Sequence, residues 1–155
     1  MEKTIENESD VVQDILQNGY KIIKGKKDFK FGIDAFLLAW FAHDGIRNGQ
    51  SVIDLCTGTG IVPLLLSSSS RAEHISGLEI QQKSAEMAIQ SVELNGLSQK
   101  IEIIQGDVKN VSAIFKAHSV EAVTCNPPYM VYGHGKQNPA GEKAISRFEV
   151  LCALE

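Results

Sequence analysis

The sequence has few of the features that mark secreted, metal-binding or membrane proteins. Its 155 residues contain three cysteines, an odd number with no C-x-x-C pair, and four histidines at no ligand spacing from them. The amino terminus has no apolar stretch behind a basic start, and the longest apolar run, 35–42, falls far short of the ~20 residues of a membrane span. We therefore expect a soluble protein of the reducing cytoplasm, with no metal and no membrane contact.

Basic charge is also in short supply. The formal net charge of -4 argues against a protein that coats nucleic acid through general electrostatics, because phosphate binding needs an excess of Lys and Arg. A local lysine cluster remains, and it either binds phosphates or forms a solvated hairpin. Its members are Lys21, Lys24, Lys26, Lys27 and Lys30. The 43% hydrophobic and 22% charged residues are ordinary for one globular domain, and they leave the oligomeric state open.

From residue 51 onward, apolar runs of strand length alternate with segments of helical spacing. Strands are expected at 51–55, 75–80, 101–105 and 120–125, and helices at 61–70, 82–95 and 108–117. Such alternation gives right-handed crossovers and a parallel sheet, so the fold class is α/β.

The two ends of the chain are less regular. We expect a short helix at 11–16 stopped by Gly19, two short strands about a turn at Gly25, and a helix at 33–43. Only one helical stretch, 143–155, follows the fourth expected strand of the alternating part. We divide the chain into an extension with a lysine-rich hairpin, 1–32, and a core, 33–155. We expect the mostly parallel, Rossmann-like sheet of this core to be truncated before its last strands, and the alternative is an unusually abbreviated fold.

A glycine-rich turn follows the first expected strand of the core. Asp54 lies near the end of this strand, and Cys56-Thr57-Gly58-Thr59-Gly60 leads into a helix. Glycines let the backbone approach a ligand, and the helix N-terminus offers unpaired N–H groups. Glu79 follows about 20 residues later, where a carboxylate accepts both hydroxyls of a ribose. The pair predicts a nucleotide-type ligand, although the turn alone also fits a tight connection below a core strand.

A second candidate lies after the third strand, at Gly106-Asp107-Val108. There Asp107 can accept a hydrogen bond from an adenine amine while the next backbone N–H reaches a ring nitrogen. The alternative is that Asp107 caps the following helix.

The tetrapeptide Asn126-Pro127-Pro128-Tyr129 directly follows the last buried strand. Two consecutive prolines remove two backbone donors, so the carbonyl oxygens are left as acceptors. Hydrogen bonds from an amine or amide to the Asn126 side-chain oxygen and the Pro127 carbonyl would turn the nitrogen lone pair toward a methyl sulfonium, and Tyr129 would stack on the planar acceptor. The alternative is a rigid surface turn.

These motifs, in this order, resemble the class I, Rossmann-like methyltransferases that act on amino groups. Within that group, the segment 19–39 resembles the bacterial tRNA (adenine-N6) methyltransferases that modify the adenosine beside the anticodon of valine tRNA. The resemblance covers residues 11–155. It implies S-adenosylmethionine as cofactor, tRNA as partner and substrate, and the exocyclic N6 of adenine as methyl acceptor.

The resemblance also implies a role for each motif residue. Residues against the methionine part, the ribose and the adenine of the cofactor would be Asp54, Cys56, Gly58, Gly60, Glu79, Ile80, Asp107, Val108 and Asn126. Phe31, Gly32 and Asp34 would close the pocket, and Asn126, Pro127, Pro128 and Tyr129 would hold the target base. Many relatives carry glycine at the position of Cys56, whose thiol we expect to pack rather than react.

The loop 130–139 has the glycine and polar content of a segment that orders over substrate, and Lys136 and Arg147 are candidate RNA contacts. Three alternatives stay open. The acceptor could be a protein glutamine or a ribosomal guanine, the chain could be a cofactor-binding fragment without activity, or the glycine-rich turn could serve a nicotinamide oxidoreductase.

Overall fold

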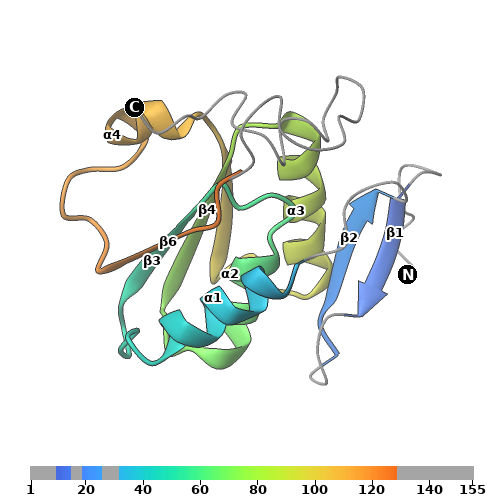
Figure 1. Cartoon of the computed structure of the whole chain (residues 1–155), viewed down its shortest axis with the longest axis horizontal. Helices are drawn as coiled ribbons and strands as arrows, with labels where there is room; N and C mark the ends of the chain where they lie inside the picture. The colour runs from blue at the N-terminus through green and yellow to red at the C-terminus, as the bar shows by residue number, and fades with distance from the viewer. Residues whose placement is uncertain (1–9, 15–18, 26–31, 129–155) are drawn as a thin grey trace.

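The computed structural model describes residues 10–14, 19–25 and 32–128, which form two sheets and the helices that cover them (Figure 1). The expected helix at 143–155, the second hairpin strand after Gly25 and the loop 130–139 lie outside these ranges. Within them, no helix has the length and apolar character needed to cross a bilayer.

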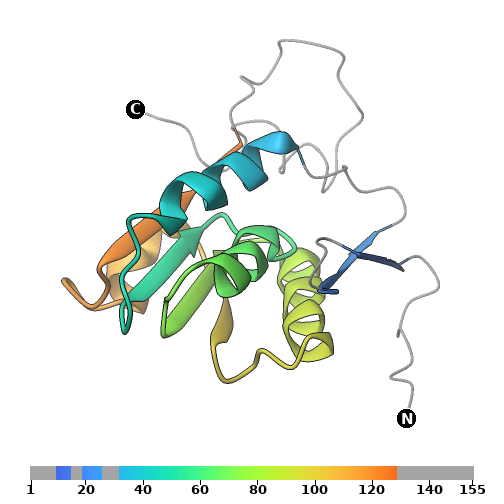
Figure 2. The same cartoon turned by 90° about the horizontal axis from the view of Figure 1, so that it is seen from below.

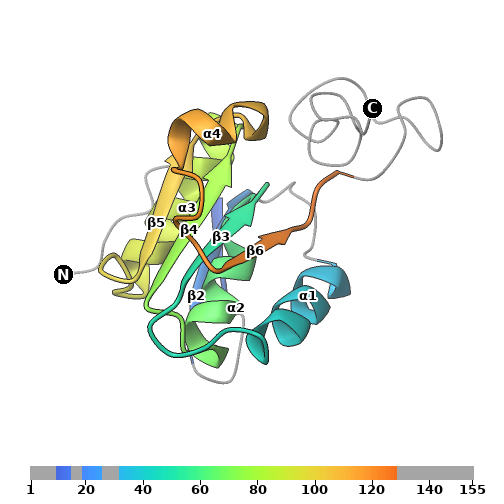
Figure 3. The ribbon, with the colours of Figure 1, turned by 90° about the vertical axis from the view of Figure 1, so that its left-hand side faces the viewer.

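The larger sheet has four parallel strands in the order β5-β4-β3-β6 (Figure 3). They are β3 (Ser51–Leu55), β4 (His74–Glu79), β5 (Ile101–Gln105) and β6 (Ala122–Cys125). From β3 the chain moves outward through β4 to β5 and then returns past β3 to β6. The order therefore reverses between β3 and β6, and ligands of open parallel sheets bind at the carboxyl ends of the strands beside such a reversal.

The helices of the core connect these strands. They are α1 (Ile33–His43), α2 (Ile61–Ser69), α3 (Gln82–Leu94), the 3₁₀ turn η1 (Val108–Asn110) and α4 (Val111–Ile114). Figure 2 shows α1, α2 and α3 following one another across the molecule. The expected parallel α/β core is confirmed, with strand and helix ends within two residues of those predicted except at the last helix.

That last helix is shorter than predicted. Residues 108–117 were expected to be helical, but the α-helix ends at Ile114 because Phe115 is extended, with φ -117° and ψ 139°. The remaining residues lead through turns to β6, and His118 there has a φ of 60°.

The prediction of a helix at 11–16 is wrong. Residues Asp10–Asp14 form β1, which pairs antiparallel with β2 (Lys21–Gly25). Two adjacent β-branched residues, Val11 and Val12, favour a strand, and pairing with β2 satisfies the backbone groups that an isolated helical turn would leave open.

The β1–β2 ribbon joins the core through α3 (Figure 1). Ile22 is fully buried, and the Ile23 N–H donates to Ser91 Oγ at 2.9 Å. The Asn95 side chain accepts from the Lys21 N–H at 2.8 Å and donates to the Lys21 carbonyl at 2.6 Å. These bonds hold β2 in a fixed register on α3.

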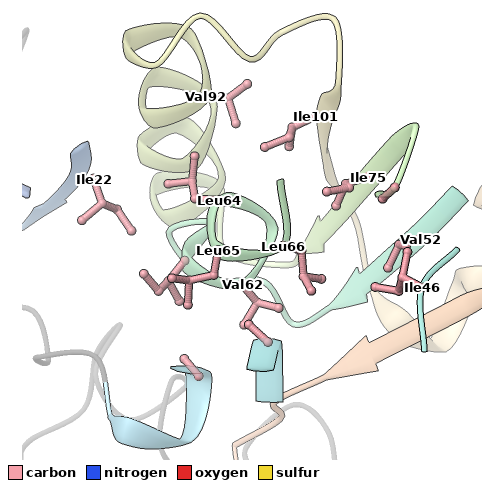
Figure 4. Packing of buried hydrophobic residues seen from close by; sticks show 14 residues of the cluster. Ile22, Ile46, Val52, Val62, Leu64, Leu65, Leu66, Ile75, Val92 and Ile101 are labelled. Carbon is pink, nitrogen blue, oxygen red and sulfur yellow. The ribbon is translucent and has the colours of Figure 1, made fainter. Parts of the chain in front are cut away.

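The core is centred on α2, whose apolar side chains meet residues from both sheets (Figure 4). Its fully or nearly fully buried members include Ile22, Val52, Leu64, Leu66, Ile75 and Val92. Burying each large aliphatic side chain contributes about 1.5–3 kcal/mol, so this cluster supplies much of the driving force for folding.

Helix α1 packs on α2 through its small residues, Ala35 and Ala39, which are 3% exposed. Its large apolar residues Ile33, Leu37, Trp40 and Phe41 are instead solvent-exposed. Alanines allow two helices to approach closely, and this approach sets which face of α1 turns inward.

Candidate functional site

The candidate residues gather at the carboxyl edge of the parallel sheet. The segments after β3, β4, β5 and β6 all begin at this edge because the four strands run in the same direction. Register places Leu55 of β3 opposite Cys125 of β6, so the glycine-rich turn and Asn126 start side by side. Motifs 70 residues apart in sequence thus meet at the reversal of strand order.

The glycine-rich turn has a backbone that few side chains tolerate. Cys56, Gly58 and Gly60 have φ values of 58°, 59° and 86°. A Cβ at Gly60 would also lie 3.2 Å from Ala88 Cβ, so glycine lets the start of α2 approach α3. A Cβ at Gly58 would meet nothing within 4 Å, which leaves the space above this residue open to a ligand.

Glu79, at the end of β4, accepts hydrogen bonds from this turn and from the loop that follows β4. Its Oε2 accepts the Gly58 N–H at 2.8 Å, and its Oε1 accepts the Gln81 N–H at 2.9 Å. The side chain is 5% exposed, and burial raises the pKa of Glu79 against the effect of these backbone hydrogen bonds. One carboxylate therefore fixes the glycine-rich turn and the start of the next loop.

Asp54 lies one strand away and is more deeply buried, at 1% exposure. Thr124 Oγ1 of β6 donates to its Oδ1 at 2.6 Å, and the two residues are register partners. Burial raises the pKa of Asp54 to about 6, although the bond from Thr124 opposes the shift. Local sequence patterns gave no signal for Thr124, which connects the acid of β3 to the strand that precedes Asn126.

The raised pKa of the buried Asp54 carboxyl makes the stability of the fold depend on pH. Its pKa is about 6 in the folded chain and 3.8 in the reference state, so between these values the folded state binds more protons than the unfolded state. The free energy of unfolding should therefore fall as pH rises through this window, by about 3 kcal/mol. Urea titrations from pH 3.5 to 7 should show this fall in the wild type and not in Asp54→Asn. Parallel pH profiles of the two proteins would exclude a contribution of Asp54 to the pH dependence.

After β5, Asp107 caps the following turn. Its Oδ1 accepts the Lys109 N–H at 2.9 Å, so the capping alternative is present in the structure. The second carboxylate oxygen has acceptor capacity left, and Asp107 and Val108 are both half-buried at the same sheet edge. Their adenine-binding role stays a prediction.

After β6, Asn126 is half-buried and faces the first turn of α1. Its Nδ2 donates to Asp34 Oδ2 at 3.2 Å. The structure thus brings Asp34 and Asn126 together, and Gly32 lies at the N-cap of the same helix. Pro127 and Pro128 follow, exposed and half-buried respectively.

Two cysteines meet beside this edge, a pairing that the sequence analysis missed. The Cys56 thiol donates a hydrogen bond to Cys125, which lowers the pKa of Cys125. The expectation that Cys56 packs rather than reacts is untested. The signal for the pairing was that Cys56 directly follows one expected strand and Cys125 ends another. The described residues contain no group of three or more metal-ligating side chains.

Four predicted site residues, Phe31, Tyr129, Lys136 and Arg147, lie outside the described residues, and so does most of the lysine cluster. Of that cluster, Lys21 is exposed and Lys24 half-buried on β2. Ile80 is half-buried next to Glu79.

Comparison with known proteins identifies the family of this chain. Residues 42–130, more than half of the chain, match the TRM5/TYW2 methyltransferase domain. The chain belongs to the TRM5/TYW2 methyltransferase domain family. The class I methyltransferase fold is thereby confirmed, and the nicotinamide oxidoreductase alternative is excluded.

Relatives within this methyltransferase group include two proteins named tRNA1(Val) (adenine(37)-N6)-methyltransferase. The one from Aliivibrio salmonicida is 28% identical over 114 residues, 74% of this chain and 46% of the relative. The one from Histophilus somni strain 2336 is 35% identical over 106 residues, 67% of this chain and 43% of the relative. The chain spans slightly less than half the length of these relatives.

Among solved structures, Methanocaldococcus jannaschii Trm5 in complex with adenosine superposes with a TM-score of 0.58 at 20% identity. The match covers 80% of this chain and 36% of that one. It supports the fold of the methyltransferase domain.

The cofactor of this methyltransferase family is S-adenosylmethionine, and the residues at the sheet edge fit it. The open space above Gly58 admits a ligand against the backbone, and Glu79 and Asp54 supply the acids expected near a ribose and a methionine ammonium group. Among the described residues, neither acid accepts a hydrogen bond from a basic side chain, so each keeps acceptor capacity for the cofactor.

Proposed function

We propose that this methyltransferase domain transfers a methyl group from S-adenosylmethionine to the exocyclic N6 of adenine in tRNA, in the valine tRNA beside the anticodon. The observation that carries the proposal is the position of Asn126, at the tip of β6 and next to the glycine-rich turn. A tRNA substrate would support a cytoplasmic location for this activity. The names of the two relatives support the acceptor.

The cofactor supplies an electrophilic methyl group on a sulfonium. The residues of the chain would bind the cofactor and orient the methyl acceptor. Glu79 would hold the ribose hydroxyls, Asp107 and the Val108 N–H the adenine, and the turn Cys56–Gly60 with Asp54 the methionine part. Phe31, Gly32 and Asp34 would border the same pocket on the side of α1.

The target amine would donate its two N–H groups to Asn126 Oδ1 and to the Pro127 carbonyl. This geometry favours a tetrahedral nitrogen whose lone pair points at the methyl carbon. Asn126 and the Pro127 carbonyl would hold this nitrogen in line with the methyl group that the cofactor would supply, and the surplus proton on the nitrogen would pass to water. Tyr129 would stack on the target base, and Pro128 would keep the tetrapeptide rigid. No titrating base is needed, because the amine becomes acidic once it is methylated.

Tritiated-methyl labelling tests the proposal. The chain is incubated with labelled S-adenosylmethionine and a cell extract that contains tRNA, ribosomes and proteins, and the product is digested with ribonuclease or protease. We expect ribonuclease to release the label, which should migrate as N6-methyladenosine. Label that survives ribonuclease and is lost to protease would overturn the tRNA proposal in favour of a protein glutamine, and label in guanine of ribosomal RNA would favour that acceptor.

Calorimetry with S-adenosylmethionine separates binding from catalysis. We expect binding together with transfer. Binding without transfer to any RNA would reduce the chain to a cofactor-binding fragment, and no heat at millimolar cofactor would exclude both the enzyme and the fragment.

A further inference from the structure

The contact between Asp34 and Asn126 joins two residues that are 92 positions apart. Asp34 Oδ2 accepts Asn126 Nδ2 at 3.2 Å, and Asp34 Oδ1 accepts the Ala35 N–H of its own helix at 3.0 Å. Both carboxylate oxygens therefore have a donor, and the carboxylate is fixed between the first turn of α1 and the tip of β6.

Gly32 provides the space for this carboxylate. A Cβ on Gly32 would overlap Asp34 Oδ1 and lie 2.9 Å from Asp34 Cγ, so any side chain there would displace the carboxylate. The backbone of Gly32 does not itself require glycine, because its φ of -70° and ψ of 159° suit any residue. The glycine is therefore explained by the position of the Asp34 carboxylate and not by a turn.

A carboxamide can rotate by half a turn and exchange its donor and acceptor ends, whereas an ionised carboxylate only accepts. Asp34 therefore selects the orientation in which Asn126 Nδ2 points to α1 and Oδ1 points away from it. No other hydrogen bond to the Asn126 amide is recorded among the described residues.

We propose that Asp34 is a positioning residue that holds the Asn126 carboxamide with its oxygen toward the methyl acceptor, and that Gly32 serves by admitting the Asp34 carboxylate. The role rests on the proposed function, and it differs from closing the cofactor pocket, the role that the family resemblance implies for Asp34 and Gly32. In the opposite orientation the Asn126 NH₂ would face an N–H of the substrate, and one hydrogen bond would be lost.

A double-mutant cycle on methyl transfer tests this role. Asp34→Ala should lower kcat about 10- to 100-fold, the effect of losing one hydrogen bond to a charged group, and leave the KM for S-adenosylmethionine within about twofold. Gly32→Ala should lower kcat in the same way although it changes no polar group. Neither change should lower the rate further in an Asn126→Ala background.

The control for the cycle is Asp44→Ala, which removes an exposed aspartate at the other end of α1 and should leave kcat unchanged. A raised KM for S-adenosylmethionine with normal kcat would assign Asp34 to the cofactor and overturn the proposal. Additive losses in the double variants would do the same.

A spectroscopic measurement separates this proposal from the proposed function. In ¹⁵N-labelled protein, the side-chain NH₂ pair of Asn126 is assigned by its absence from Asn126→Ala. One proton of the pair should exchange slowly and lie downfield in the wild type, and both features should vanish in Asp34→Ala and Gly32→Ala. If the wild type methylates no RNA, the proposed function fails, yet the NMR spectra still decide whether Asp34 orients Asn126. Unchanged spectra in both variants would overturn the positioning role.

Discussion

Replacing Asn126 by Ala should reduce methyl transfer about 10²- to 10⁴-fold while S-adenosylmethionine still binds with nearly unchanged affinity. The change removes the oxygen that would hold the target amine, and the Pro127 carbonyl alone leaves that amine free to rotate. The Asp54 and Glu79 side chains keep their partners, Thr124 and the backbone of residues 58 and 81. Calorimetry for the cofactor and labelled-methyl transfer for the rate would measure the two quantities separately.

The matched control is Asn48→Ala, which makes the same truncation at an exposed position in the turn before β3. It should leave both quantities unchanged. Transfer by Asn126→Ala at more than a third of the wild-type rate would show that the amide does not position the acceptor.

Replacing Glu79 by Gln should weaken S-adenosylmethionine binding about 100-fold and lower the melting temperature. The carboxylate accepts backbone N–H groups with both oxygens, from Gly58 and from Gln81. A carboxamide has only one oxygen, so its NH₂ would face one of these donors in a nearly closed environment, at a cost of about 1–3 kcal/mol. The turn would then leave the position that admits the cofactor, and the group proposed to bind the ribose would lose half its acceptors.

Glu102→Gln is the control for this substitution, because Glu102 lies on β5 and is exposed. It should change neither affinity nor melting temperature. Unchanged cofactor affinity in Glu79→Gln would rule out Glu79 as a cofactor ligand, and an unchanged melting temperature would show that its two backbone bonds contribute little to stability.

Local sequence patterns were sufficient to place the main site residues along the chain. Asp54, Glu79 and Asn126 each end a short apolar run, and runs of that kind become parallel strands whose ends share one edge. The glycines at 58 and 60 were also readable, because a turn between a strand and a helix needs positive φ. The roles of these residues toward cofactor and substrate remain predictions.

Contacts between residues far apart in the sequence could not be predicted in the same way. Thr124 has no local signal beyond that of a strand residue, and its position opposite Asp54 follows from the register of β3 and β6. Ser91 has no local signal beyond that of a helix residue, and its bond to β2 follows from the packing of β2 on α3. The helix expected at 11–16 failed for a similar reason, because the partner strand that stabilises β1 lies beyond an intervening segment. Helical spacing alone also could not decide which face of α1 turns inward.

The sequence by itself determined the α/β alternation, the glycine-rich turn and the residues that stand at each strand end, because these follow from periodicity and backbone sterics over a few neighbouring positions. Only the tertiary structure decided that Asp34 contacts Asn126, that Gly32 makes room for that contact, and that Thr124 bonds to a buried Asp54. Such contacts depend on strand order and helix packing, which distant parts of the chain settle together.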